Sequence, residues 1–380
     1  MILEKTVNFE ETVGNGSLFS CIIIKKCRAA VRFASLNMGA EWFPESYRIR
    51  RSEMTKRFRR NLILILLILF VIYWAAVNVL VSAVLVPSFM EQLDAFERIA
   101  EQSYAEQVQE SELITNANAM YTIGKAWGKR ADVEKVEILS EDGYRLRGAM
   151  EEKDGKHRWV VLLHGYTGSK EMMYGYAYWY AEHGFSVLAP DFRCQGESEG
   201  DYIGLGATDS KDLAGWIDLI LQRDPEAEIV LHGLSMGAST ALIYSGGDVP
   251  GNIKAVISDS AYTDAYSMFR EKIGSWFYLP AFPIVDSAEL MIRIRAGYDL
   301  KETSPLKAVS HSRVPTFFIH GKEDRMIPVE MCHALYDAAS CEKEIMIVEG
   351  SGHTQSAEKD PVGFFGEVQK FLGEYIGEIP

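Results

Sequence analysis

A serine, an acid and a histidine in this 380-residue sequence have the types and the order needed to attack an acyl carbonyl. Ser235 lies in Gly233-Leu234-Ser235-Met236-Gly237, directly after the apolar run EIVLHG. A serine hydroxyl is a poor nucleophile near neutral pH, so it needs a histidine as general base and a carboxylate that orients the histidine. On a turn of the form GxSxG, the acid and then the histidine are expected later in the chain.

Candidates for both partners follow apolar runs near the C-terminus. Asp324 comes after VPTFFIHG and His353 comes after KEIMIVEG, so we assign Asp324 as the orienting acid and His353 as the base. Glu323, one residue earlier, is the competing acid, and Asp259, at the end of the run KAVISDS, is a third candidate.

The negative charge that develops on the carbonyl oxygen needs preorganised N–H donors. One donor is expected to be the backbone amide of Met236, the residue after the nucleophile. The second should come from the loop after WVVLLHG, where we assign the amide of Tyr166. Gly233 and Gly237 leave the room that a tight turn around the serine requires.

Other histidines have structural explanations. His232, just before the serine turn, is predicted to pack in the core, and His164 and His320, at the ends of apolar runs, are predicted to satisfy backbone groups in turns. Carboxylates and histidines do not cluster at metal-ligand spacing, so we expect neither a metal nor another cofactor.

Short apolar runs alternate with helical patterns from Val133 onward. VEKVEIL and YRLRGAM flank Glu141-Asp142-Gly143 and predict a hairpin. The runs WVVLLHG, FSVLAPD, EIVLHGLS, KAVISDS, VPTFFIHG and KEIMIVEG predict strands of a parallel sheet covered by helices on both faces. Ligands bind at the carboxyl ends of such strands, which is where the candidate residues lie.

The N-terminal part predicts a membrane anchor. Residues 62–86 contain no charged side chain and are long enough for one transmembrane helix. The basic flank at 54–61 is expected to stay cytoplasmic, which places the C-terminal domain outside the cytoplasm. Val81-Ser82-Ala83 resembles a signal-peptidase site only weakly, so we favour an uncleaved anchor. Residues 87–130 are rich in helix formers and predict a helical juxtamembrane segment.

Residues 1–53 have two interpretations. Their pattern has no helical or strand period, and adjacent AGG codons for Arg50 and Arg51 would place a bacterial ribosome-binding sequence shortly before Met54. We favour an over-extended gene start, and a disordered cytoplasmic tail is the alternative.

Charge and cysteine usage limit the partners. The net charge is −14, with +6 on residues 1–60 and −20 on the rest, which argues against nucleic acid and against anionic lipid headgroups as main partners. Cys332 and Cys341 are expected to be free thiols, and a disulfide between them in an oxidising compartment is the alternative.

Five motifs in register resemble the α/β-hydrolase superfamily, and most closely its bacterial serine aminopeptidase-like and lysophospholipase-like members. They are HGYTGSK, DFRCQGESEG, HGLSMGAS, HGKEDRMIP and SGHTQS. The resemblance covers roughly residues 133–380 and implies an eight-stranded sheet, a Ser235/Asp324/His353 triad, and Tyr166 and Met236 as oxyanion donors. Members of the superfamily usually carry glycine where Cys194 stands, so the resemblance does not determine the conformation of that loop.

A segment at 261–312, within a hydrolase domain at 131–380, takes the place where the superfamily carries a lid. Two interpretations of its apolar residues stay open: an acyl or aromatic pocket over Ser235, or a small helical cap packed on the sheet. The residues are Trp276, Phe277, Tyr278, Leu279, Phe282 and Met291.

These features together predict a membrane-anchored serine hydrolase that cleaves carboxylic esters of small molecules or lipids. The anchor and the aromatic lid favour a lipid-derived ester. A serine aminopeptidase-type peptidase is an alternative, for which Glu197, Glu199 and Asp201 are available to bind a substrate amine. A catalytically idle binding protein on the same fold is the other alternative.

Overall fold

The computed structural model describes residues 45–91, 111–153, 155 and 157–380. Contacts divide the chain into two compact units, 1–72 and 73–380, whose boundary lies within the long helix α2 (Glu45–Leu85). Most of the predicted tail or over-extended start at 1–53, and residues 92–110 of the predicted juxtamembrane segment, lie outside the described residues.

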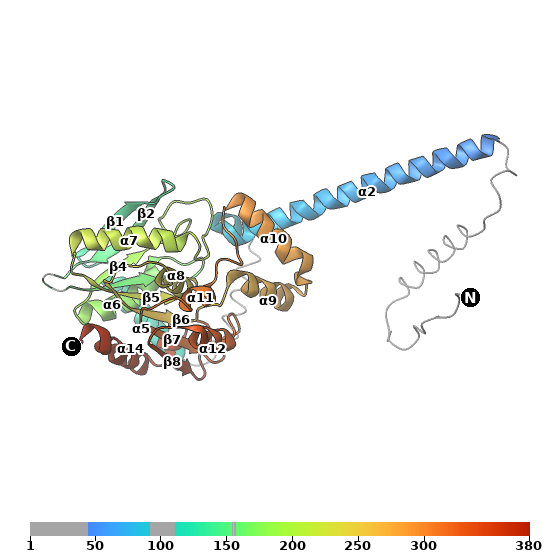
Figure 1. The fold of residues 1–380 in the computed structure, drawn as a ribbon. Helices are drawn as coiled ribbons and strands as arrows, with labels where there is room; N and C mark the ends of the chain where they lie inside the picture. Colours follow the sequence, from blue (N-terminus) through green and yellow to red (C-terminus); the bar gives the residue numbers. More distant parts are fainter. Residues whose placement is uncertain (1–44, 92–110, 154, 156) are drawn as a thin grey trace. The chain divides into compact units, whose positions relative to one another are not determined.

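One eight-stranded sheet forms the centre of the second unit (Figure 1). The strand order is β1-β2-β4-β3-β5-β6-β7-β8; β2 pairs antiparallel with β1 and β4, and the remaining neighbours are parallel. The strands are β1 (Val133–Leu139), β2 (Arg145–Glu151), β3 (Arg158–Leu163), β4 (Ser186–Pro190), β5 (Glu228–Leu234), β6 (Ile253–Asp259), β7 (Thr316–Gly321) and β8 (Lys343–Val348). The predicted hairpin and all six predicted parallel-type runs are confirmed as strands.

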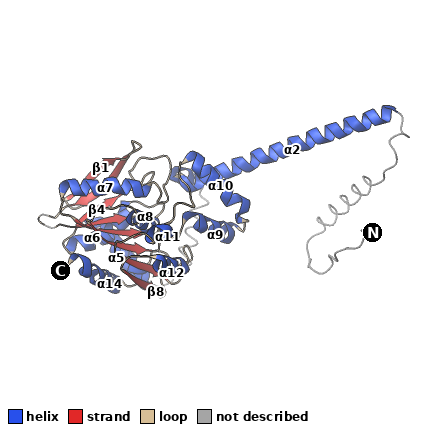
Figure 2. Cartoon of the chain, viewed as in Figure 1, coloured by secondary structure: helices blue, strands red, loops and turns tan. Residues whose placement is uncertain are grey.

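Helices cover both faces of the sheet, as Figure 2 shows in colour. Besides α2, the described helices are α3 (Pro87–Glu91), α5 (Ser111–Trp127), η1 (Lys170–Met173), α6 (Tyr174–Glu182), α7 (Asp209–Arg223), α8 (Met236–Ser245), α9 (Ala265–Phe277), α10 (Ala281–Arg295), α11 (Pro305–Val309), α12 (Val329–Ala338), α13 (Ser356–Lys359) and α14 (Pro361–Ile376). One apolar core joins α7, α8 and α12 to the sheet, and a second joins α5, α6 and α14 to its other face. Central strands such as β5 are buried on both faces, which explains their nearly unbroken apolar sequence.

The segment between β6 and β7 holds α9, α10 and α11, and we call α9 with α10 the lid. Asp264 caps α9 by accepting a hydrogen bond from the backbone N–H of Ser267 at 2.7 Å. Tyr278 ends α9 in the left-handed conformation, with φ of 53°. These two residues mark where α9 begins and ends.

The last three turns of α2 belong to the second unit and pack within it. Val77, Val81 and Leu85 recur at a spacing of four and are buried. The guanidinium of Arg295 donates to the backbone oxygen of Asn78 and to Ser82 Oγ, and the backbone N–H of Ile203 donates to Leu85 O. By length and composition, Glu53–Leu85 is apolar enough to cross a membrane.

The second apolar core gives a stability prediction. Phe371 on α14 is fully buried, with its ring centroid 5.3 Å from that of Phe317 on β7. Phe371→Ala should lower the free energy of unfolding by about 3–5 kcal/mol, because it removes apolar contacts and leaves a cavity. Urea unfolding of the full chain in detergent measures this. Val362→Ala, on the same helix but 87% exposed, should change the free energy of unfolding by less than about 0.5 kcal/mol. An equal loss of unfolding free energy in both variants would contradict the packing described.

Candidate active site

Ser235 sits on a strained turn between β5 and α8. Its φ of 53° and ψ of −112° lie outside the favoured regions for a residue with a side chain. A Cβ on Gly233 would lie 2.3 Å from Gly237 C, and one on Gly237 would lie 2.1 Å from Leu163 O. Since no side chain fits at either glycine, the turn can approach β3 closely and present the serine at the strand ends.

Two hydrogen bonds join Ser235, His353 and Asp324, the three residues assigned from the sequence. His353 Nε2 lies 2.9 Å from Ser235 Oγ, and His353 Nδ1 lies 2.7 Å from Asp324 Oδ2. With the Nδ1 proton held by the carboxylate, the lone pair of Nε2 is aimed at the serine hydroxyl. This arrangement can remove the serine proton during attack on a carbonyl carbon.

Three hydrogen bonds and a contact with His320 hold the Asp324 carboxylate. Oδ1 accepts from the backbone N–H groups of Met326 and Ile327, both at 2.8 Å. Oδ2 accepts from His353, and His320 Nε2 lies 3.2 Å from it. Burial alone would raise the pKa of Asp324, but the charge and hydrogen bonds of the two histidines hold it well below its usual range. The Asp324 carboxyl therefore stays ionised near neutral pH.

The two competing acids lie elsewhere. Glu323 is exposed, and its backbone N–H donates to Ser351 O. Asp259 is buried, which raises the pKa of its carboxyl to about 6, and it accepts a hydrogen bond from Ser260 Oγ. Ser260 Oγ in turn accepts from the backbone N–H of Thr354, so Asp259 supports the loop that carries His353. Of these three carboxyls, Asp324 is the one bonded to His353.

Both expected oxyanion donors lie beside the serine. Tyr166 and Met236 line the same cavity as Ser235. Met236 is the first residue of α8, where backbone N–H groups have no acceptor within the helix. A Cβ built on Gly165, next to Tyr166, would lie 3.7 Å from Ser235 Cβ, so the loop after β3 passes close to Ser235.

The cavity beside Ser235, which we call the serine cavity, has a volume of about 140 Å³. Its lining is almost entirely apolar and comes from three parts of the chain: the strand-end loops, α9 and the end of α2. From α9 come Met268, Phe269, Lys272 and Ile273, and from α2 come Leu80, Ala83 and Val84. A cavity of this character suits an acyl or alkyl chain next to the nucleophile.

The aromatic residues expected over Ser235 do not line this cavity where the structure describes them. Tyr278, Leu279 and Phe282 are exposed by 90%, 46% and 76%. Met291 is half-buried against the core, and the side chains of Trp276 and Phe277 lie outside the described residues. Tyr278 ends α9 and begins the turn into α10, and this turn exposes these residues to solvent.

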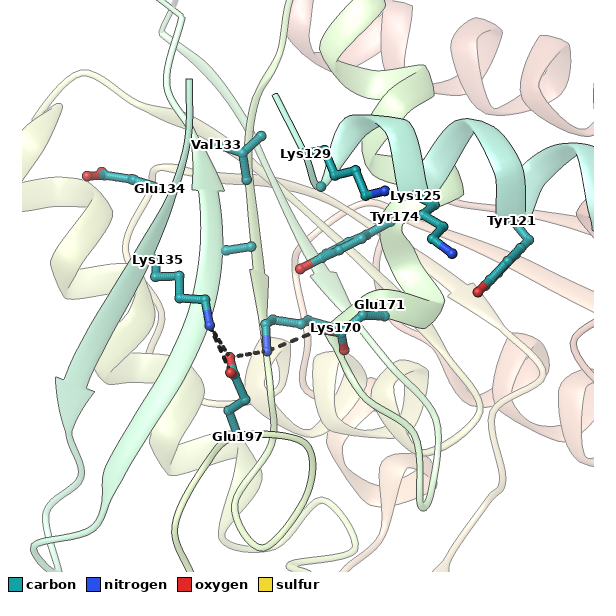
Figure 3. A pocket seen from close by; sticks show the side chains of 12 residues that line it. Tyr121, Lys125, Lys129, Val133, Glu134, Lys135, Lys170, Glu171, Tyr174 and Glu197 are labelled. Carbon is teal, nitrogen blue, oxygen red and sulfur yellow. Dashed lines mark hydrogen bonds and ion pairs between the residues drawn. The ribbon is translucent and has the colours of Figure 1, made fainter. Parts of the chain in front are cut away.

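A larger cavity of about 430 Å³ lies away from Ser235, between α5, β1 and η1, and carries charged side chains (Figure 3). Glu197 accepts hydrogen bonds from Lys135 and Lys170, which lower the pKa of Glu197 to about 2. Lys170 also bonds to the buried Asp191, which accepts from both the ammonium and the backbone N–H of Lys170. These pairs hold the loop that carries Tyr166 in place.

Two features of the site were not predicted. His320 was expected to bond backbone groups; its Nε2 does lie 2.8 Å from Ile327 O, but it also faces Asp324. The sequence HGKED, in which His320 stands four residues before Asp324, is the signal from which this contact could have been predicted. Leu80, Ala83 and Val84 belong to a run predicted only as a membrane span, and nothing in its composition indicates a cavity wall.

The other predictions concern two buried histidines, the cysteines and metal binding. His164 Nε2 accepts from the backbone N–H of Phe192, and His232 is buried against Tyr180, both as expected. Cys194 has a φ of 61°, the left-handed region that favours glycine, as the motif's usual glycine suggests. Cys194, Cys332 and Cys341 are free thiols. Within the described residues, no three His, Cys, Asp or Glu side chains are grouped to hold a metal ion.

Comparisons with known proteins identify the family and the fold. A family model described as "Alpha/beta hydrolase family" matches residues 160–366, just over half of the chain. The uncharacterized protein YqkD of Bacillus subtilis (strain 168) is 28% identical over 236 residues, which span 62% of this chain and 77% of YqkD. The lysophosphatidylserine lipase ABHD12 of Danio rerio is 27% identical over 202 residues, 50% of this chain and 49% of that protein.

Among solved structures, the esterase Pf2001 of Pyrococcus furiosus is similar, with a TM-score of 0.54 and 25% identity. The likeness covers 64% of this chain and 92% of the esterase. With the sheet order described above, these matches confirm the predicted α/β-hydrolase fold.

The three candidate acids can be separated by isosteric substitution. Asp324→Asn should slow the reaction of Ser235 with a fluorophosphonate by a large factor, about 10⁴ by analogy with serine proteases, because the imidazole loses its orienting carboxylate. Asp259→Asn and Glu323→Gln should each change the rate by less than about threefold. The labelling rate of purified protein measures all three, with circular dichroism as the folding control. A large loss in Glu323→Gln with Asp324→Asn unaffected would exchange the two assignments.

Proposed function

The chain belongs to the alpha/beta hydrolase family, and from this premise we propose that it is a serine hydrolase that cleaves carboxylic esters through an acyl-enzyme on Ser235. The observation that carries the proposal is the hydrogen-bonded chain from Ser235 through His353 to Asp324, placed at the wall of an apolar cavity.

The proposed reaction has two halves. Ser235 Oγ attacks the ester carbonyl carbon while His353 Nε2 takes the hydroxyl proton, and the amides of Tyr166 and Met236 stabilise the oxyanion. The C–O bond to the alcohol then breaks, and His353 returns the proton to the leaving oxygen. In the second half, His353 takes a proton from water, whose oxygen attacks the acyl-enzyme, and the carboxylic acid leaves as Ser235 regains its proton.

The surroundings of the site favour an ester over a peptide with a free amine. The three carboxylates available to anchor a substrate amine have partners of their own: Glu197 bonds to Lys170, Glu199 to Arg145 and Asp201 to Tyr144. None of the three is among the described residues that line the serine cavity. The names of two similar proteins, a lysophosphatidylserine lipase and an esterase, also favour an ester, and the first favours a lipid ester.

The proposal includes the membrane anchor. Residues 62–86 would cross the membrane once, with the basic flank at 54–61 in the cytoplasm and the hydrolase domain outside it. A domain held at the membrane surface meets lipid esters at high local concentration, which fits an apolar cavity.

Labelling with a fluorophosphonate tests the nucleophile. Membranes that contain the full chain should be labelled at Ser235, because His353 activates that hydroxyl, and Ser235→Ala should abolish the labelling. Peptide mapping locates the adduct. Ser239→Ala, four residues on and also buried, is the matched control and should keep the label. Unlabelled, folded wild-type protein would favour the idle binding protein.

The orientation of the domain can be tested in intact cells. Val362→Cys, at an exposed position, should react with a membrane-impermeant maleimide in intact cells. Thr55→Cys, in the basic flank, should react only after the cells are permeabilised. Wild-type protein, labelled in parallel, gives the background of the native thiols. The reverse pattern would place the hydrolase domain in the cytoplasm.

A further inference from the structure

The turn between the two lid helices exposes an unusual amount of apolar surface. We call residues 278–282 the lid tip. Its Tyr278 and Phe282 are 90% and 76% exposed, and Leu279 between them is 46% exposed. Large apolar side chains gathered on an exposed turn mark a surface that contacts a partner or a membrane.

The lid tip lies beside α2 at the middle of the candidate membrane span. Tyr73 Oη lies 2.7 Å from Ser287 Oγ and donates to Pro283 O, directly after the tip. At its other end, α10 reaches Asn78 and Ser82 through Arg295. The helix α10 therefore runs alongside α2 from Tyr73 to Ser82, with the apolar tip at the Tyr73 end and the arginine at the Ser82 end.

The thickness of a bilayer indicates how deep in the membrane the contact between α10 and α2 would lie. Every residue of 62–72 is exposed, and these eleven residues of helix cover about 17 Å, only half of a hydrocarbon core of ~30 Å. If α2 crosses the membrane, the rest of the crossing must come from the residues after Ile72, to about residue 81. Those are the residues on which α10 packs, so the lid tip would lie at hydrocarbon depth and Arg295 near the lipid headgroups.

The contact between α2 and the lid helices lies next to the serine cavity. A small cavity of about 40 Å³ lies between α2, α9 and α10, and it shares four lining residues with the serine cavity. The shared residues are Leu80, Val84, Phe269 and Ile273. A chain of apolar side chains thus extends from the lid helices to Ser235, and the end of the anchor helix forms one wall of it.

We propose that the lid tip inserts into the same bilayer that α2 crosses, and that the serine cavity takes the acyl chain of its substrate from that bilayer. The substrate class is then a membrane lipid ester. The second half of this proposal rests on the proposed hydrolase function, whereas insertion of the tip does not.

Depth measurements test the insertion without reference to activity. The full chain is reconstituted in phosphatidylcholine vesicles with a nitroxide at Phe282→Cys or, as control, at Val362→Cys, an apolar position 87% exposed on α14. The label at 282 should collide more with oxygen than with a nickel chelate, and the label at 362 should do the reverse. Labelled wild-type protein supplies the background of native thiols. Preferred collision with the nickel chelate at both positions would overturn the proposal.

Activity measurements test the supply of substrate. Phe282→Asp should lower hydrolysis of a long-chain ester carried in vesicles at least tenfold, while hydrolysis of a short water-soluble ester stays within twofold. Val362→Asp should leave both rates unchanged. Equal loss on both esters, or no loss on either, would contradict uptake from the bilayer. If wild-type protein hydrolyses neither ester but the label at 282 lies in the bilayer, the hydrolase function fails and the insertion stands.

Discussion

The hydrogen bond between His353 and Asp324 is the contact on which the rest of the site depends. It forms because β7 and β8 are parallel neighbours, with Gly321 opposite Val348, so that the loops after both strands meet at one edge of the sheet. The loops touch closely: a Cβ on Gly321 would lie 2.3 Å from Gly352 O. Three hydrogen bonds then fix the Asp324 carboxylate, the carboxylate orients the imidazole of His353, and the other ring nitrogen of His353 bonds to Ser235.

Local signals were sufficient to predict the sheet and the order of the reactive residues. Strands buried on both faces need apolar residues at nearly every position, and the turn after β5 needs glycine where a Cβ would collide, as at Gly237. These requirements act on consecutive residues, so they appear in the sequence. Asp259, which ends β6, and Asp324, which follows β7, were recognised for the same reason, and the sequence already favoured Asp324 as the orienting acid. In the structure Asp324 is the one that bonds to His353.

The features that sequence reasoning missed depend on contacts between distant segments. The apolar residues of the lid fit a pocket lining by composition, but a left-handed Tyr278 at the end of α9 turns the chain, and Met268 and Phe269 line the cavity in place of Tyr278 and Phe282. Likewise, the absence of charge in residues 62–86 predicts contact with lipid along the whole run. That Val77, Val81 and Leu85 are buried in protein follows only from the surface that α9, α10 and the sheet present to them.

The hydroxyl of Tyr166 donates to Val84 O at 2.5 Å, which ties the loop after β3 to the last turn of α2. Proteolysis after Ala83, at the weak signal-peptidase site Val81-Ser82-Ala83, would remove Leu80 and Ala83 from the wall of the serine cavity and separate Val84 from the rest of α2. One side of the serine cavity would then be open to water. Because the end of α2 is part of the cavity wall, release of the domain at that site would change the cavity beside Ser235.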